Sequence, residues 1–169
     1  MVLFFTHIPL AVNHTIKATP PERLQQYHTI FLQETWLAKQ TLDKLTDISD
    51  IHFACGTAEV DYTKGITSGR PYGWTAILWN KKLNAKIVMN QDQSIIGLEV
   101  CLDSSSLNFL NVYMPYCCDS NYDEYINYLS KISTLCDETD SPNVFIVGDL
   151  LALITILVNC YPNSAWNMN

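Results

Sequence analysis

Short apolar runs separated by polar turns recur along the chain, and this pattern predicts a sheet-rich fold. Residues 28–32 form one such run, in which β-branched and aromatic side chains favour a buried strand. Four more runs follow one another closely, at residues 74–79, 85–90, 94–102 and 107–113. Because the turns between them are short and polar, we expect these four strands to form an antiparallel meander. The pattern also predicts one or two strands within residues 2–16 and short strands at residues 51–54 and 143–147.

Helical periodicity is clearest at residues 121–137. Five apolar side chains recur there at helical spacing, namely Tyr125, Tyr128, Leu129, Ile132 and Leu135. We expect these side chains, the aromatic ones included, to face the core rather than to stack on nucleic-acid bases. A second helical stretch is expected after Trp36, and residues 59–72 are polar and contain glycines, which predicts a loop.

Glu34 follows the apolar run at residues 28–32 almost directly, so we expect its carboxylate at the C-terminal end of a buried strand. A carboxylate held there at the edge of a core suits a hard cation such as Mg²⁺, which takes one or two carboxylate ligands and keeps several waters. The alternative is a strand-end glutamate that points into water and binds nothing. The local pattern alone leaves both interpretations open.

Composition limits the kind of partner that the chain can bind. A length of 169 residues is that of one domain, and 48% hydrophobic residues describe a globular chain with a core. The net charge is −7, from 10 basic and 17 acidic residues. Since Lys and Arg supply much of the affinity for phosphate backbones, this balance argues against tight, non-specific nucleic-acid binding. It is compatible with an enzyme whose acidic site holds a metal.

The cysteines and the apolar ends bear on the cellular location. Six cysteines, at positions 55, 101, 117, 118, 136 and 160, show no CxxC or zinc-ligand spacing, so we expect reduced thiols in a nuclear or cytoplasmic chain that is not secreted. The apolar first twelve residues contain no Lys or Arg and do not resemble a signal peptide. The apolar run after Val144 contains Asp149, which would be costly at membrane depth, and we therefore expect no membrane span.

Four short sequence words occur in an order and at spacings that resemble a known superfamily. They are Gln-Glu-Thr-Trp-Leu at residues 33–37, Gly-Arg-Pro-Tyr-Gly at 69–73, Asn-Val-Tyr-Met-Pro at 111–115 and Gly-Asp-Leu-Leu-Ala at 148–152. Together they resemble the endonuclease/exonuclease/phosphatase superfamily, and most closely the endonuclease domain of non-LTR (LINE-type) retrotransposons. The resemblance covers residues 28–152.

The resemblance implies an α+β fold of the endonuclease/exonuclease/phosphatase type, an α/β sandwich of mostly antiparallel sheets with flanking helices. We expect the matched span to supply about the first sheet and to leave the second half incomplete. An uncovered sheet face would then need a partner or favour aggregation. The implied organisation is a divergent N-terminal segment at residues 1–27, a partial domain at residues 28–152 and an unrelated apolar tail at residues 153–169.

The resemblance also assigns roles to residues of a metal-dependent phosphodiesterase that acts on DNA. Glu34 would hold Mg²⁺, or Mn²⁺ in its place. Asn13 is a second candidate ligand, although a solvated turn Asn is the favoured interpretation of this residue. Tyr113 matches a tyrosine that approaches the scissile phosphate. Asp149 matches the aspartate that orients or activates the attacking water or protonates the leaving group. Arg70 is a candidate phosphate-binding residue, with a solvated loop arginine as the alternative.

This chain departs from the family pattern at several positions. Leu151 stands where the family has a phosphate-binding Asn, and Leu offers no hydrogen-bonding group. Trp74 replaces a second Gly of the family, and no histidine follows His52, so the family's catalytic Asp-His pair has no counterpart in this chain. Two hypotheses follow. The chain is either a Mg²⁺-dependent DNA endonuclease of retrotransposon origin with impaired activity, or a catalytically dead, truncated relic that acts at most as a binding or structural fragment.

Overall fold

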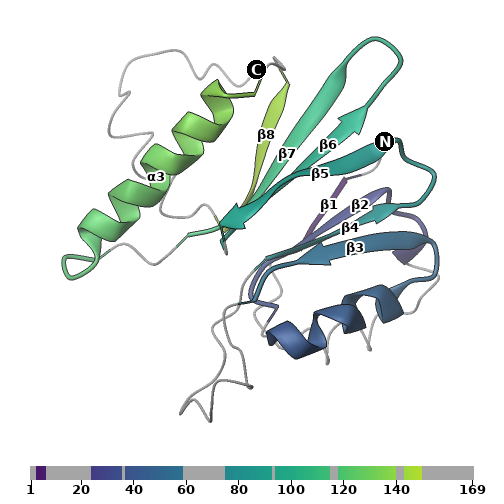
Figure 1. The fold of residues 1–169 in the computed structure, drawn as a ribbon, viewed down its shortest axis with the longest axis horizontal. Helices are drawn as coiled ribbons and strands as arrows, with labels where there is room; N and C mark the ends of the chain where they lie inside the picture. The colour runs from purple at the N-terminus through teal and green to yellow at the C-terminus, as the bar shows by residue number, and fades with distance from the viewer. Residues whose placement is uncertain are drawn as a thin grey trace, which may run out of the picture.

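The described parts of the chain form two four-stranded sheets that lie face to face between two helices (Figure 1). This computed structural model describes residues 3–6, 24–35, 37–58, 75–92, 94–114, 118–139 and 143–149. The first sheet contains, in spatial order, β1 (Leu3–Thr6), β2 (Thr29–Leu32), β4 (Ala76–Asn80) and β3 (His52–Gly56). The second sheet contains β5 (Ala85–Asp92), β6 (Ile95–Cys101), β7 (Ser106–Tyr113) and β8 (Val144–Asp149). The helices are the 3₁₀ helix η1 (Lys39–Ile48) and the α-helix α3 (Tyr122–Asp137).

The positions of the strands confirm most of the expectations from the apolar pattern, but the four-stranded meander is wrong. Strands β5, β6 and β7 do form an antiparallel meander, whereas β4 pairs with β2 and β3 in the other sheet. The short turn after Asn80 therefore carries the chain from one sheet to the other. A short polar turn can join two neighbouring strands of one sheet or two strands of different sheets. The sequence alone therefore did not show which of these the turn after Asn80 does. The two outer pairs, β1 with β2 and β7 with β8, are parallel.

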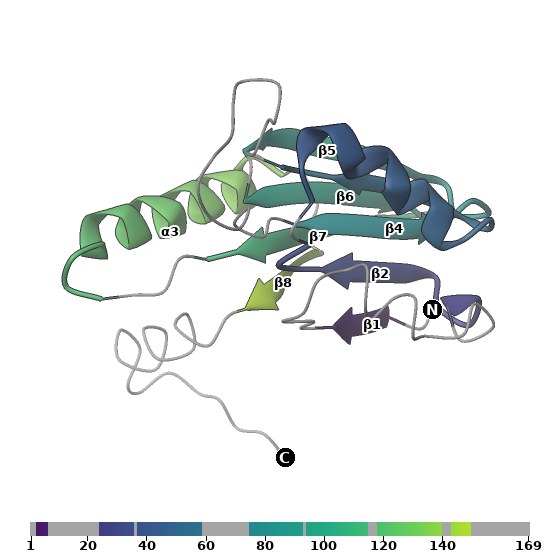
Figure 2. The ribbon, with the colours of Figure 1, turned by 90° about the horizontal axis from the view of Figure 1, so that it is seen from below.

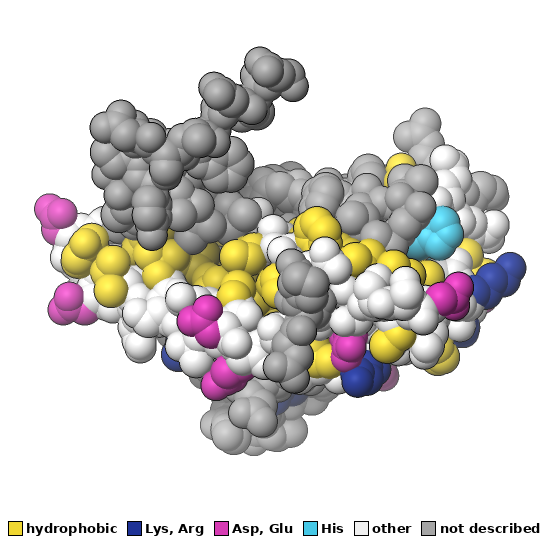
Figure 3. Space-filling view, turned by 90° about the horizontal axis from the view of Figure 1, so that it is seen from above, with side chains coloured by type: hydrophobic (Ala, Val, Ile, Leu, Met, Phe, Trp, Pro, Cys, Tyr) yellow, Lys and Arg dark blue, Asp and Glu magenta, His cyan; other side chains and the backbone are white. Residues whose placement is uncertain are grey.

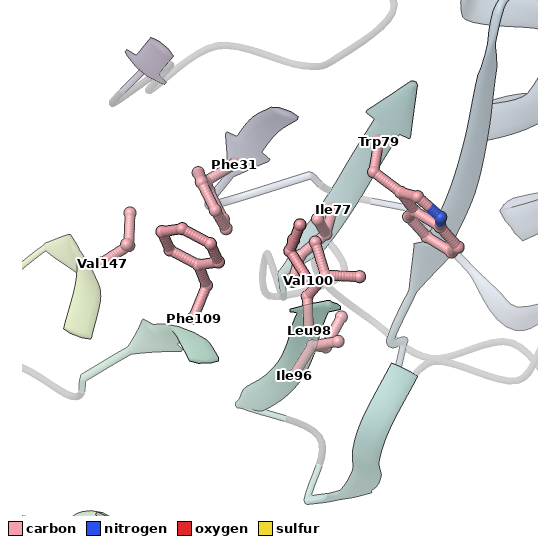
Figure 4. Packing of buried hydrophobic residues seen from close by; sticks show 8 residues of the cluster. All are labelled: Phe31, Ile77, Trp79, Ile96, Leu98, Val100, Phe109 and Val147. Carbon is pink, nitrogen blue, oxygen red and sulfur yellow. The ribbon is translucent and has the colours of Figure 1, made fainter. Parts of the chain in front are cut away.

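An apolar cluster fills the space between the two sheets. From the first sheet it contains Phe31, Ile77 and Trp79, and from the second Ile96, Leu98, Val100, Phe109 and Val147 (Figure 4). The rings of Phe31 and Phe109 meet across this space with their centroids 5.5 Å apart. We call these eight residues the inter-sheet cluster. Because side chains alternate along a strand, every second residue of the central strands belongs to it.

The intervening residues point outward and are covered by the two helices. On the first sheet, Ile30 and Leu32 pack in one cluster with Leu45 of η1. On the second sheet, Leu110 and Val112 pack in another cluster with Tyr125 and Ile132 of α3. The arrangement thus has four layers, with a helix on the outside of each sheet (Figures 1 and 2). Both helix predictions are confirmed, including the burial of Tyr125 in the core.

The expectation that the chain supplies about one sheet is wrong. Both sheets are present with four strands each, since the strands from Ala85 onward build a second sheet instead of extending the first. Their inner faces pack against each other through the inter-sheet cluster. The reason for expecting a partner on an uncovered inner face therefore disappears.

The cysteines and the apolar run before Asp149 complete the comparison with the sequence. Among the described residues, Cys55, Cys101, Cys118 and Cys136 are not joined in disulfide bonds. Within the parts of the chain that the structure describes, no helix is long and apolar enough to cross a membrane. The apolar residues before Asp149 form strand β8.

A buried histidine makes the stability of the first sheet depend on pH. His52 is only 2% exposed. Its Nε2 lies 3.0 Å from the carbonyl oxygen of Tyr27, and since a carbonyl oxygen only accepts, Nε2–H donates this hydrogen bond. Its Nδ1 lies 2.8 Å from the hydroxyl of Ser49. Desolvation by burial lowers the pKa of His52 below its ordinary value, and the nearby His28 and Lys81 lower it further. The folded protein therefore holds this imidazole neutral near pH 7.

We predict that acidification below pH 6.5 destabilises the fold through His52. The unfolded chain takes up a proton at this histidine at a higher pH than the folded chain, so the free energy of unfolding falls as the pH drops through that window. The measurement is the urea unfolding midpoint at pH 7 and at pH 5, compared between the parent and His52→Gln. The variant should show a smaller loss on acidification. Equal losses in the two proteins would contradict the prediction.

Candidate functional site

The site is built around Glu34, which lies two residues beyond the end of β2. Its backbone φ is 52°, and it is the one non-glycine residue with a positive φ in the described ranges. Non-glycine residues rarely adopt this left-handed conformation, which persists when the surrounding structure enforces it. The next residue, Thr35, turns back into the core and is 1% exposed. The chain thus leaves β2 through a tight turn that leaves the Glu34 side chain partly exposed.

Tyr113, the last residue of β7, reaches Glu34 from the opposite sheet. Its hydroxyl donates a hydrogen bond to Oε1 of Glu34 over 3.1 Å. The two residues are 79 positions apart in the sequence. Two of the sequence-predicted site residues are therefore brought into direct contact.

Asp149 ends β8 beside Tyr113. The backbones of the two residues are register partners in the parallel pair of β7 and β8. In Figure 2 the arrowheads of β2, β7 and β8 point to the same side of the molecule. Glu34, Tyr113 and the backbone of Asp149 thus lie at one end of the sandwich, whereas the side chain of Asp149 lies outside the described residues.

Glu34 and Asp149 belong to different sheets of the sandwich. Glu34 follows β2 of the first sheet, and Asp149 ends β8 of the second. The neighbour of β8 is β7. Strands β2 and β8 contact each other across the sandwich, and Tyr113 links the two positions through its hydrogen bond to Glu34 and its register with Asp149.

The glycine before Asp149 has a steric reason. Gly148 adopts a φ of +151°, and a Cβ added to it would collide with the backbone carbonyl oxygen of Val112 in β7. Strand β8 can therefore lie this close to β7 only with glycine at this position. The Gly-Asp word of the sequence thus places Asp149 against the end of β7.

Sequence reasoning missed two residues beside the site, Gln33 and Asn111. The side chain of Asn111 in β7 donates hydrogen bonds from Nδ2 to the carbonyl oxygens of Leu32 and Ala76, over 3.1 and 2.9 Å. Its Oδ1 accepts a hydrogen bond from Nε2 of Gln33 over 2.6 Å. The signal was present in the sequence, since Asn111 interrupts an apolar strand two residues before Tyr113 and so shares a strand face with it.

The remaining predicted residues lie outside the described residues. These are Asn13, Arg70 and the two family departures, Trp74 and Leu151. Their assignments remain predictions.

The described residues fit a weakly held Mg²⁺. Glu34 offers a partly exposed carboxylate, which is the ligand type that Mg²⁺ prefers. The hydroxyl of Thr35, the next residue, is buried and has no hydrogen-bond partner. In the described ranges, no group of three His, Cys, Asp or Glu side chains comes together as a metal site. A Mg²⁺ ion bound at Glu34 would therefore keep several of its waters.

The described part of the face in Figure 3 carries few positive charges for a nucleic-acid partner. Figure 3 shows acidic side chains spread along the described part of one face, with few and scattered Lys and Arg side chains. Asp123 and Glu124 lie in the first turn of α3. The described part of this face therefore offers few basic side chains that could neutralise a phosphate backbone.

No protein-family model and no curated protein sequence matches the chain. Solved structures do match its fold. D. rerio TDP2 humanized by 14 mutations matches with a TM-score of 0.55 and 14% identity, over 86% of this chain and 62% of that one. Caenorhabditis elegans TDP2 matches with a TM-score of 0.51 and 15% identity, over 82% and 42% of the two chains. An endonuclease/exonuclease/phosphatase family protein from Leptotrichia buccalis matches with a TM-score of 0.50 and 14% identity, over 82% and 61%.

The fold is that of an endonuclease/exonuclease/phosphatase-type α/β sandwich. The chain spans less than two thirds of the length of each of these structures. The expected fold class is thus confirmed.

We predict that Tyr113 and Glu34 are energetically coupled. The bond is charge-assisted but only partly buried, so a double-mutant cycle of Tyr113→Phe and Glu34→Ala should give a coupling free energy of about 1 kcal/mol. The measurement is urea unfolding of the four proteins at pH 7 without divalent cations. A matched cycle of Tyr113→Phe with Glu99→Ala, whose carboxylate pairs with Lys86 on the surface, should give no coupling. Additivity in the first cycle would show that the bond does not exist in solution.

Proposed function

We propose that the chain carries the metal-binding part of a site that hydrolyses phosphodiesters in DNA. The observation that carries this proposal is the hydrogen bond between Glu34 and Tyr113 at the end of the sandwich where β8 ends in Asp149. A metal-ligand type, a phenol and a second acidic residue are thereby gathered from three strands. A carboxylate that holds a metal beside further polar groups is compatible with metal-assisted phosphoryl transfer.

Each of these residues has a distinct role in the proposal. Glu34 would hold Mg²⁺ or Mn²⁺, with Asn13 as a further candidate ligand. The bound metal supplies charge that stabilises the phosphoryl oxygens in the transition state. Tyr113 would fix the orientation of the Glu34 carboxylate through its hydroxyl and approach the scissile phosphate. Asp149 orients the attacking water, and Arg70 is the candidate donor to the DNA backbone.

The wider assignment rests on two kinds of support. The fold resembles structures named TDP2 and a protein named for the endonuclease/exonuclease/phosphatase family. The four sequence words favour an origin from a retrotransposon endonuclease, with the related unit at residues 28–152. A nuclear or cytoplasmic location agrees with this proposal.

Catalysis by these 169 residues alone is expected to be impaired. Leu151 cannot supply the amide that the family uses for phosphate, and no histidine follows His52 to act with the bound phosphate and water. The second candidate function is therefore a fragment that binds metal without catalysis. The excess of acidic over basic residues favours this candidate, because it disfavours tight binding of the DNA that the enzyme would cleave.

We predict a small stabilisation by Mg²⁺ that depends on Glu34. A dissociation constant of about 1 mM is expected for a site with one or two carboxylates. At tenfold excess Mg²⁺ the stabilisation would be about 1.4 kcal/mol, or a rise of roughly 3–5 °C in Tm. The measurement is a thermal melt with and without MgCl₂ for the parent, Glu34→Gln and the control Glu124→Gln. An equal shift in Glu34→Gln, or no shift in the parent, would exclude Glu34 as the ligand.

We predict little or no nicking of DNA by the purified chain. Supercoiled plasmid would be incubated with Mg²⁺ and the parent, Glu34→Ala or Leu151→Asn, and the relaxed form would be quantified on a gel. Nicking by the parent that disappears in Glu34→Ala would disprove the impairment and confirm the site. Nicking gained in Leu151→Asn and lost again in the double variant with Glu34→Ala would identify the missing amide as the cause of impairment.

A further inference from the structure

We infer that Asn111, acting through Gln33, is the positioning residue that holds Glu34 in its metal-binding orientation. This inference rests on the proposed function of Glu34. Asn111 does not itself touch a metal or substrate. Its side chain acts on the two residues that precede Glu34 in the chain.

Both polar atoms of the Asn111 side chain, Nδ2 and Oδ1, form hydrogen bonds at the end of β2. The two N–H groups of its amide are donated to the carbonyl oxygens of Leu32 and Ala76. These two residues are register partners in the antiparallel pair of β2 and β4. The amide thus clamps both strands at the level where β2 ends. Its oxygen accepts the bond from Gln33, the next residue of the chain.

The clamp restricts the backbone on the N-terminal side of Glu34. Leu32 is held through its carbonyl oxygen and Gln33 through its side chain, while Glu34 follows with a φ of 52°. Two residues further along β7, Tyr113 holds the Glu34 carboxylate itself. Strand β7 therefore fixes three consecutive residues of the β2 exit. With both its backbone approach and its carboxylate held, Glu34 has one orientation.

Burial makes this clamp strong and specific. Asn111 is 0% exposed and Gln33 is 3% exposed. Buried amides are costly unless their hydrogen bonds are made, and here loss of either partner leaves the other unpaired. An apolar side chain at position 111 would continue the inter-sheet cluster, to which Phe109 of the same strand face belongs. An amide at this position instead serves the strand exit that leads to Glu34, as residues behind a metal ligand commonly do.

The test uses Mn²⁺ as the probe, with binding followed by water-proton relaxation at 10 °C and folding checked by circular dichroism. The variants are Asn111→Leu, which removes all three bonds, and Gln33→Met, which removes only the bond between the two side chains. The matched control is Val100→Ala, which damages the inter-sheet cluster away from β2. Loss of a group behind a metal ligand typically weakens metal binding about 10- to 100-fold. We expect this loss in Asn111→Leu, a smaller loss in Gln33→Met and unchanged affinity in Val100→Ala.

The outcomes separate this inference from the proposed function. Unchanged Mn²⁺ affinity in both Asn111→Leu and Gln33→Met, with binding lost in Glu34→Gln, would overturn the positioning role and leave the metal site intact. A loss of affinity in Val100→Ala equal to that in Asn111→Leu would also overturn it, because any destabilisation would then suffice. Absence of Mn²⁺ binding in the parent would overturn both. If Asn111→Leu does not fold, Gln33→Met decides the question by itself.

Discussion

The contact of the two sheets through the inter-sheet cluster is the constraint on which the rest of the structure depends. Phe31 and Phe109 meet across it, and full burial of a side chain of this kind contributes about 1.5–3 kcal/mol. On the same strand faces, the polar residues Gln33 and Asn111 meet at the next position along each strand. The apolar contact thus sets the distance and register at which the polar contact forms. The position of Glu34, the residue after Gln33, therefore depends on both contacts.

The strands and helices could be predicted where the sequence shows a short apolar run or apolar residues at helical spacing. The strands at β2, β5, β6, β7 and β8 and the helix α3 all matched apolar patterns. The assignment of strands to sheets could not be predicted, because both faces of strands such as β4 are buried and the turn after Asn80 carries no mark of the crossing. Packing between residues far apart in the sequence decides to which sheet each strand belongs, and the local sequence pattern does not contain this information.

The candidate site was predictable in part for a related reason. Glu34 and Tyr113 stood out because a polar residue ended an apolar run and because the words around them resemble a family. Asn111 and Gln33 did not stand out, since each is an ordinary amide whose importance arises from a partner 78 positions away. The available clue was that Asn111 and Tyr113 are two residues apart and so share one face of the strand. This clue points to the site only when the opposite sheet is known to lie against that face.

The separation of the site residues along the chain has a consequence for how the protein is made. Antiparallel neighbours such as β5, β6 and β7 are joined by short turns, so their contacts are local and form early in folding. The bond between Glu34 and Tyr113 closes a loop of 79 residues, and β8 joins β7 only after α3 has been synthesised. During translation, Glu34 emerges from the ribosome long before its partners. A chain in which only the first sheet has folded therefore lacks the hydrogen bond that holds the Glu34 carboxylate.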